Sequence, residues 1–546
     1  MKYRLVLYWL FTGLGCSVLF AQEHGLETIT IADLRQHLEF LASEKMQGRG
    51  DGKPGLDSAA RYLTTRIGDI GLIPVDENMD YIQDYTLYKN TYSRDKNKIS
   101  ISYRGHEQVI GNRDFYMIVP QNPESMHLKG EIVFAGYGIK SEENHYDDFE
   151  NVNVKGKIVL IMDRAPTSED GSSCLFEDIG CHSLQNLFYK YFQILMLQPK
   201  AILVVLDPKS GHSSLGDIDP SLPGMISTFY SYEAPSETDE DQTGEKMKVI
   251  LIHRDIADKI LEGTGYTLPG LQEMIDRELK PHSFPVRNKT ISIDLEMSHD
   301  KIIMPNVAGL VRGSDPVLGN EVLVLMAHFD HIGTDSSGKI YRGADDNASG
   351  SVALLEMAKA FMQENHKPGR SILFLWVSGE EIGLFGSRYY TAHPLLPLNN
   401  TIAAINLDMV GRTKTPADTG IIMNDSVNVL GADTLGVIGG HQSRELLHIA
   451  DSFARNCHIV PDYNYNDINH PQKLYYRSDH FSFVVHDIPV LFFSTGIHRD
   501  YHQLTDTPEK IDYERLEKVC RFVYLLSYSL ADRKERIVVD HPYSTW

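Results

Sequence analysis

Five side chains of the types that zinc prefers lie at the ends of apolar, strand-like runs or in the loops beside them. They are two histidines and three acidic residues: His328, Asp346, Glu381, Asp408 and His502. Neutral imidazole nitrogens and carboxylate oxygens are common protein ligands of Zn²⁺, and one catalytic zinc typically uses three of them. Five ligands therefore suit two metals that share one carboxylate. We expect Asp346, which lies in a tight polar turn, to be the shared ligand.

Two more acidic residues are placed to assist such a centre. Glu380 is adjacent to Glu381 at a strand end, so the two side chains diverge and Glu380 can face the substrate as a general base. Asp330 follows His328 by two residues, which puts both on the same side of a strand. There it can hold the far nitrogen of the imidazole.

Each of these residues also has a purely structural explanation when it is taken alone. The sequence Asp345-Asp346-Asn347 could cap a helix, Glu380-Glu381 could be a solvated pair, and His328 could be a buried structural histidine. The motifs occur together, in one order, and each follows an apolar run. This co-occurrence favours the metal-dependent interpretation.

The elements that carry these residues predict an α/β domain. Apolar runs at 322–327, 372–377 and 402–407 each end next to a ligand-type residue, and strands alternate with helices from about residue 306 onward. Open α/β sheets place their active sites at the carboxyl ends of the strands. The pattern over 29–71 is helical. Short β-type runs separated by Gly, Asn and Asp turns follow and predict a β-rich module over 115–290.

The net charge and the amino-terminal segment indicate the cellular compartment of the protein and exclude some classes of binding partner. The formal net charge of −22 over 546 residues argues against nucleic acid and anionic membranes as partners. Lys2 and Arg4 precede an apolar stretch that ends before Ala21, which predicts a secretory signal peptide over 1–21. We therefore expect an extracytoplasmic protein, periplasmic or secreted, with no membrane span after cleavage. An uncleaved anchor or a lipoprotein site at Cys16 are the alternatives.

Four cysteines remain after cleavage of the predicted signal peptide. Cys174 and Cys181 flank a short segment and could pair in an oxidising compartment. Cys457 and Cys520 lie far apart, and the sequence does not pair them. None stands in a CxxC motif, so a thiolate zinc site is not expected.

The chain resembles peptidase family M28, a family of co-catalytic zinc peptidases that includes secreted aminopeptidases. The matching segments are AHFDH (327–331), GADDNASG (343–350), SGEEIGL (378–384), NLDMVGR (406–412), RSDH (477–480), DYH (500–502), TDT (505–507) and Gly48-Arg49. The resemblance implies an α/β fold with a mixed, mostly parallel sheet sandwiched by helices. It also implies that 22–114 and 291–546 together form the peptidase domain.

The resemblance further implies how the five ligands divide between two Zn²⁺ ions. One zinc would be held by His328 and Asp408, the other by Glu381 and His502, with Asp346 as the bridge.

Other roles follow from the same resemblance. Glu380 would be the general base and Asp330 the orienting carboxylate. Tyr501 matches a position from which some relatives donate a hydrogen bond to the tetrahedral oxyanion. The peptide bond between Asp346 and Asn347 would be cis, a rare form without proline.

The module at 115–290 resembles a protease-associated (PA) domain. The segments 136–139, 146–148 and 154–160 carry this likeness. Such modules are usually non-catalytic lids or substrate-access elements.

The function expected from the residues and the resemblance together is that of a secreted di-zinc metallopeptidase. It would most simply be an aminopeptidase that removes N-terminal residues from peptides through a metal-bound hydroxide and the base Glu380. One alternative is a glutaminyl-cyclase-like acyltransferase, which shares the fold but uses a single zinc. Another is a catalytically silent binding protein. The filled ligand positions, including both His328 and Asp408, argue against these two alternatives.

Overall fold

The structure is a computed structural model, and it divides the chain into two compact units. Together they include the described residues 23–75, 80–92, 96–111, 115–118, 125–142, 144–167, 190–191, 193–218, 228–233, 248–335, 337–423 and 425–545. The first unit comprises Met1–Thr86 and Ile303–Trp546, and the second comprises Leu87–Ile302. The predicted signal peptide and the cysteines Cys16, Cys174 and Cys181 lie outside the described residues.

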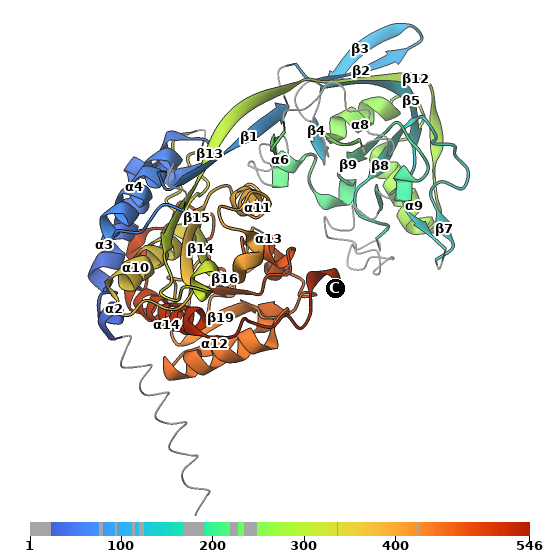
Figure 1. Ribbon diagram of the computed structural model, residues 1–546. Helices are drawn as coiled ribbons and strands as arrows, with labels where there is room; N and C mark the ends of the chain where they lie inside the picture. Colours follow the sequence, from blue (N-terminus) through green and yellow to red (C-terminus); the bar gives the residue numbers. More distant parts are fainter. Residues whose placement is uncertain are drawn as a thin grey trace, which may run out of the picture. The chain divides into compact units, whose positions relative to one another are not determined.

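A mixed sheet forms the centre of the first unit (Figure 1). Its strands lie in the order β13 (Met297–Val311), β15 (Ser371–Val377), β14 (Val322–His328), β16 (Thr401–Leu407), β21 (Val490–Ser494), β19 (Thr434–Gly439) and β20 (Val460–Asp462). The neighbours β15, β14, β16 and β21 run parallel to one another. The strands β13 and β19 are antiparallel to their partners β15 and β21. On the side of β13 away from β15, the same sheet continues with β1 (Ile82–Tyr92).

Helices cover both faces of this sheet, as a parallel sheet with continuous apolar strands requires. On one face α10 (Gly350–Gln363) contacts β14 and β16, and it packs against α2 (Glu23–Glu27), α3 (Ile31–Leu41), α4 (Pro54–Ile70) and α14 (Tyr513–Asp532). The indole of Trp376 on β15 donates to the carbonyl of Ser351 on this side. The mixed, mostly parallel sheet between helices that the sequence analysis predicts is confirmed.

The other face of the sheet has its own apolar core. Val324, Met326 and Leu375 pack there with Tyr390 of α11 (Phe385–Ala392) and Phe483 of α13 (Phe481–Val484). Successive strand residues point to opposite faces, so each apolar run supplies both cores. The helix α12 (Arg444–Asn456) contacts α14 and β20.

The second unit contains an eight-stranded sheet. Its order is β3 (His106–Gly111), β2 (Lys98–Tyr103), β12 (Phe284–Leu295), β5 (Met126–Phe134), β8 (Ile158–Met162), β9 (Ala201–Val205), β11 (Val249–Ile252) and β4 (Phe115–Ile118). The short strands β6 (Lys140–Ser141) and β7 (Tyr146–Asp147) and the helices α6 (Leu215–Ile218), α8 (Arg254–Leu261) and α9 (Leu268–Glu278) also belong to this unit, whereas β10 (Thr228–Ser231) pairs antiparallel with β1.

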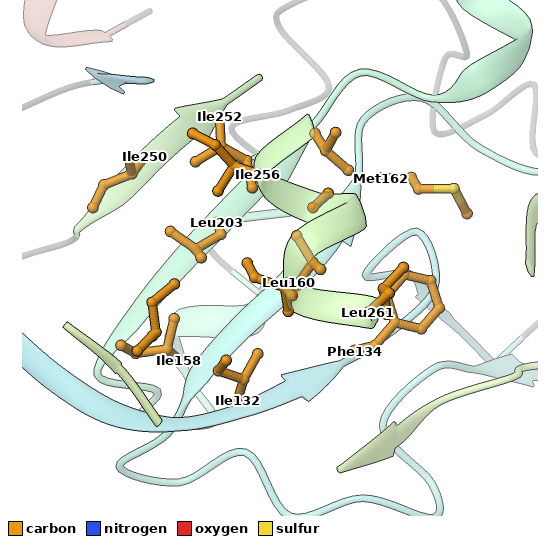
Figure 2. Close-up of a cluster of buried hydrophobic side chains, with 14 of the residues drawn as sticks. Ile132, Phe134, Ile158, Leu160, Met162, Leu203, Ile250, Ile252, Ile256 and Leu261 are labelled. Carbon is orange, nitrogen blue, oxygen red and sulfur yellow. The ribbon is translucent and has the colours of Figure 1, made fainter. Parts of the chain in front are cut away.

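Aliphatic side chains from the middle strands of the second unit pack under α8. Figure 2 shows Leu160, Leu203 and Ile252 facing Ile256 and Leu261 of that helix. The unit thus has a core of its own, and the range 115–290 of the sequence analysis falls within Leu87–Ile302. Among the residues that the structure describes, no helix combines the length and the apolar character that crossing a bilayer needs.

Candidate metal centre

The ligand-type residues meet at the carboxyl ends of the parallel strands of the first unit. His328 is the last residue of β14 and pairs with Val377, the last residue of β15. Asp408 directly follows β16, and Glu381 follows β15 in the adjoining loop. The shared direction of the strands brings these chain ends to one edge of the sheet, as expected for an open α/β fold.

One carboxylate is approached by two histidines from opposite sides. The Nε2 atom of His328 lies 3.4 Å from Oδ1 of Asp346, whereas Nε2 of His502 lies 3.1 Å from Oδ2 of the same side chain. His328 Nε2 also lies 3.3 Å from Oδ1 of Asp408, and His502 Nε2 lies 3.0 Å from Oε2 of Glu381. The five predicted ligands therefore form two groups that share Asp346.

The donor set fits divalent zinc. It consists of imidazole nitrogens and carboxylate oxygens, which are zinc ligands. Within the described chain, Oδ2 of Asp346 is buried and accepts no hydrogen bond. Buried polar atoms nearly always have a hydrogen-bond partner. Oδ2 of Asp346 has none among the described residues, and it lies close to His502, so a bound cation would supply the missing partner.

His331 belongs to the same cluster, although in the sequence it stands only in the matching segment AHFDH and has no predicted role. Its Nδ1 atom lies 2.8 Å from Oε1 of Glu381 and 3.7 Å from Oδ2 of Asp346. With these two carboxylates it forms one of two groups of metal-type residues found in the described part of the chain; the other is His328, Glu380 and Asp408. The alternation of a strand would turn His331 away from His328. Because β14 ends at His328, that alternation does not continue to His331.

Asp330 lies beside the far nitrogen of His328, as predicted, but its main contact is elsewhere. The distance between its Oδ1 atom and Nδ1 of His328 is 3.6 Å, longer than a hydrogen bond. Its Oδ2 atom accepts a hydrogen bond of 3.2 Å from the backbone amide of Glu381. Asp330 thus connects the ends of β14 and β15.

The adjacent carboxyl groups Glu380 and Glu381 have opposite pKa shifts. Burial raises the pKa of Glu380 well above its ordinary value; His328 opposes this shift, whereas Asp408 and Glu381 add to it. Burial and Asp346 also disfavour the ionised form of Glu381, but His502 and His331 outweigh them and lower its pKa to about 2. Divergent pKa values of neighbouring acids are typical of acid–base sites.

Tyr501 lines the cavity next to the cluster. Its ring stacks on the imidazole of His502, with ring centroids 3.8 Å apart and an interplanar angle of 25°. Burial raises the pKa of its phenol well above the ordinary value, and Asp346 and Glu381 add to this effect. The hydroxyl therefore remains a hydrogen-bond donor at neutral pH.

The turn Ala344–Ser349 that carries Asp346 has an irregular backbone. The peptide bond between Asp346 and Asn347 is cis, which confirms that prediction. The amide side chain of Asn347 donates to the carbonyl of Leu407 over 2.9 Å and accepts from the amide of Gly350 over 2.9 Å. The turn is thereby fixed to the end of β16.

Asp506 holds the other side of this turn. Its Oδ2 atom accepts hydrogen bonds from the backbone amides of Asp345 and Asp346, at 2.9 and 3.2 Å. Asp345 in turn accepts from the amide of Gly411 at 2.7 Å. In the sequence, Asp506 stands only in the matching segment TDT, because a carboxylate that binds backbone amides leaves no periodic signal.

An apolar cavity adjoins the metal-type residues. It is bordered by Asp346, Glu380, Asp408 and Tyr501 on one side. Its remaining wall is largely apolar and contains Met409, Leu430, Ile438, Leu474, Phe492 and Ile497, with Arg477 and Tyr465. Arg477 is itself bound by both carboxylate oxygens of Asp425, at 2.7 and 2.8 Å.

Comparison with known proteins gives results that agree with this geometry. A family model described as peptidase family M28 matches residues 306–526. The probable leucine aminopeptidase of Arthroderma otae is 26% identical over 225 residues, covering 40% of this chain and 57% of that protein. The probable leucine aminopeptidase 1 of Trichophyton verrucosum is 34% identical over 134 residues, covering 22% of this chain and 35% of that protein.

The chain thus spans between about a third and a little over half of the length of these two relatives. Among solved structures, an aminopeptidase from Aneurinibacillus sp. strain AM-1 aligns with 94% of this chain and 97% of its own, with a TM-score of 0.53 and 17% identity. At this level of identity, the match shows that the two chains have similar folds.

The two hydrogen bonds that Asp506 accepts predict a stability effect. Replacing Asp506, which is fully buried, by Ala leaves two buried amides without their acceptor and removes one of the two carboxylates beside Arg412. We expect the free energy of unfolding to fall by about 3 kcal/mol, the usual cost of breaking a buried charge pair. Urea unfolding measures this, with Asp433→Ala as the control. The Asp433 carboxylate is exposed and paired with Lys518, so its loss should change little; equal effects of the two substitutions would contradict the prediction.

Proposed function

We propose that the protein is a metallo-aminopeptidase of peptidase family M28 with two zinc ions; the match of the family model to residues 306–526 supports this proposal. The observation that carries this proposal is the placement of Asp346, whose two oxygens face the two histidines His328 and His502 at 3.4 and 3.1 Å. One zinc would be held by His328 and Asp408, the other by His502 and Glu381, and Asp346 would bridge them. His331 is close enough to Glu381 to orient it.

Bound zinc supplies a Lewis acid that polarises the scissile carbonyl and lowers the pKa of water. The protein side chains carry the remaining steps. Glu380 takes the proton of the attacking water and passes it to the leaving amine, because it borders the cavity beside His328 and Asp408 and is not one of the proposed ligands. The phenol of Tyr501 donates a hydrogen bond to the carbonyl oxygen as negative charge develops there.

The apolar cavity supports a preference for a large apolar residue at the substrate's amino terminus. Its wall of Met409, Leu430, Ile438 and Phe492 adjoins the residues that would hold zinc. A buried aliphatic side chain contributes about 1.5–3 kcal/mol by leaving water. The similar proteins from Arthroderma otae and Trichophyton verrucosum are named leucine aminopeptidases, which agrees with this preference.

We also propose an extracytoplasmic location and a non-catalytic second unit. The charge and apolar pattern of residues 1–21 support export. Both groups of metal-type residues that the described chain contains lie in the first unit. The PA-like module at 115–290 would then modulate access to substrate without contributing ligands.

Glu380→Gln tests the general base. We expect this variant to bind as much zinc as the wild type but to lose about 10²–10⁴-fold in kcat on leucyl anilide, because the amide cannot accept the proton. Glu39→Gln, at an exposed position of helix α3, serves as the control and should keep full activity. Near-normal turnover by Glu380→Gln would remove Glu380 from the proposed mechanism.

Elemental analysis tests the number of metals. We expect two zinc ions per chain in the wild type and about one in Asp408→Ala, since Asp408 approaches His328 but not His502. Chelation should abolish hydrolysis, and added zinc should restore it. A single zinc in the fully active wild type would contradict the two-metal proposal.

A substrate panel tests the cavity assignment. We expect kcat/KM for leucyl anilide to exceed that for aspartyl anilide by about 10-fold or more, because burial of the leucine side chain stabilises the complex. An acetylated leucyl anilide should not be cleaved if a free amino terminus is required. Cleavage of the acetylated substrate at the same rate would indicate an endopeptidase instead.

A further inference from the structure

Arg49 is a fully buried residue that the mechanism above does not use. It ends the 3₁₀-helix Glu44–Arg49 between α3 and α4, and its exposed fraction is 0%. In the sequence, the pair Gly48-Arg49 only resembles a segment of the family and has no predicted role.

The guanidinium of Arg49 binds four backbone carbonyl groups. Its Nε donates to Phe329 at 2.8 Å, its Nη1 to Leu41 and Arg342, each at 2.8 Å, and its Nη2 to Gly343 at 2.7 Å. Four of its five N–H groups are therefore used. A planar fork of fixed donors is the property that distinguishes arginine from lysine.

Three of these four carbonyls belong to the two loops that carry the central ligand-type residues, and the fourth belongs to Leu41 at the end of α3. Phe329 directly follows His328, and Gly343 precedes Asp346 by three residues. One rigid group thus spans the loop after β14 and the turn of the bridging carboxylate. Because His328 Nε2 and Asp346 Oδ1 lie 3.4 Å apart, a shift of either loop would change that distance directly.

The backbone around Arg49 is fixed to the same loop. The amide of His331 donates to the carbonyl of Arg49 at 3.2 Å, and the amide of Gly333 donates to the carbonyl of Gly48 at 3.1 Å. Gly48 has a φ of +67°, and a Cβ atom there would lie 2.3 Å from the carbonyl oxygen of Tyr341. A side chain at position 48 is excluded, so the segment can lie directly against the loop.

The charge of Arg49 has no ion-pair partner among the described residues. Burial lowers its pKa to about 10, while Asp346 and Asp330 act in the opposite direction. It is therefore charged at neutral pH, in a position where a buried cation without a carboxylate contact is costly. Its four carbonyl contacts offset this cost.

We propose that Arg49 is a positioning residue that sets the spacing between the loop of His328 and the turn of Asp346, and thereby the affinity for zinc. This inference rests on the zinc centre of the proposed function. The planar arrangement of the guanidinium donors is the essential property, and not the charge alone. The four carbonyls lie in different segments of the chain, and only fixed donors in several directions reach all of them.

The substitutions Arg49→Lys and Arg49→Met separate geometry from charge. Lysine keeps the charge but cannot reach four carbonyls, and methionine loses both. We expect the zinc dissociation constant of the metal-free full chain, measured by competition with a chromophoric chelator, to rise about 10–100-fold in both variants, as for other residues that orient ligands. Added guanidinium at millimolar concentration should partly restore zinc affinity to Arg49→Ala.

Arg370→Met is the matched control. Arg370 is also fully buried and donates to Glu321 and to the carbonyls of Arg533 and Lys534. It directly precedes β15, at the end opposite Glu380. We expect Arg370→Met to lower the midpoint of urea unfolding while the zinc dissociation constant stays at the wild-type value.

The possible outcomes separate this inference from the proposed function. Wild-type zinc affinity in Arg49→Lys would overturn the positioning role, and so would an equal loss of affinity in Arg370→Met. If Arg49→Met does not fold, Arg49→Lys decides the question. A wild-type protein that binds no zinc would refute the proposed function and this inference with it. If the wild type binds zinc and cleaves peptides, the Arg49 variants test the positioning role alone.

Discussion

At the edge of the central sheet, two histidines from distant parts of the chain approach the opposite oxygens of one buried carboxylate, Asp346. This arrangement places several acidic groups close together away from water, where their repulsion is strong. Burial disfavours ionisation of Asp346, but the adjacent imidazoles of His328 and His502 outweigh it and hold its pKa well below the ordinary value. The surrounding structure has to keep these groups in place against their mutual repulsion.

The fold meets this requirement by fixing the backbone more than the side chains. Asn347 and Asp506 bind opposite sides of the turn that carries Asp346. Asp330 binds the amide of Glu381, and Ser478 donates to Asp408 at 2.7 Å. Asp346, Glu381 and Asp408 are thus each held by a neighbour that is itself buried, and the apolar strands behind them supply a rigid base.

Much of this arrangement could be predicted from the sequence. The apolar runs over 322–327 and 372–377 indicated buried parallel strands, and the direction of such strands places His328 and Glu381 at one edge. His331 could not be placed, because the alternation that assigns side chains to faces ends where β14 ends. The contacts of Asp506 and Arg49 could not be predicted either, since they are made to backbone groups remote in sequence and leave no pattern of residue types.

The contacts of Arg49 also bear on how the protein is synthesised and folds. Its partners Phe329 and Gly343 lie 280 and 294 residues further along the chain, and the whole of the second unit is translated between them. Such long-range closure is slow compared with the formation of local structure. During synthesis the amino-terminal helices are therefore made long before the strands and loops that they contact. A shortened chain that begins after Ile302 would lack Arg49 altogether.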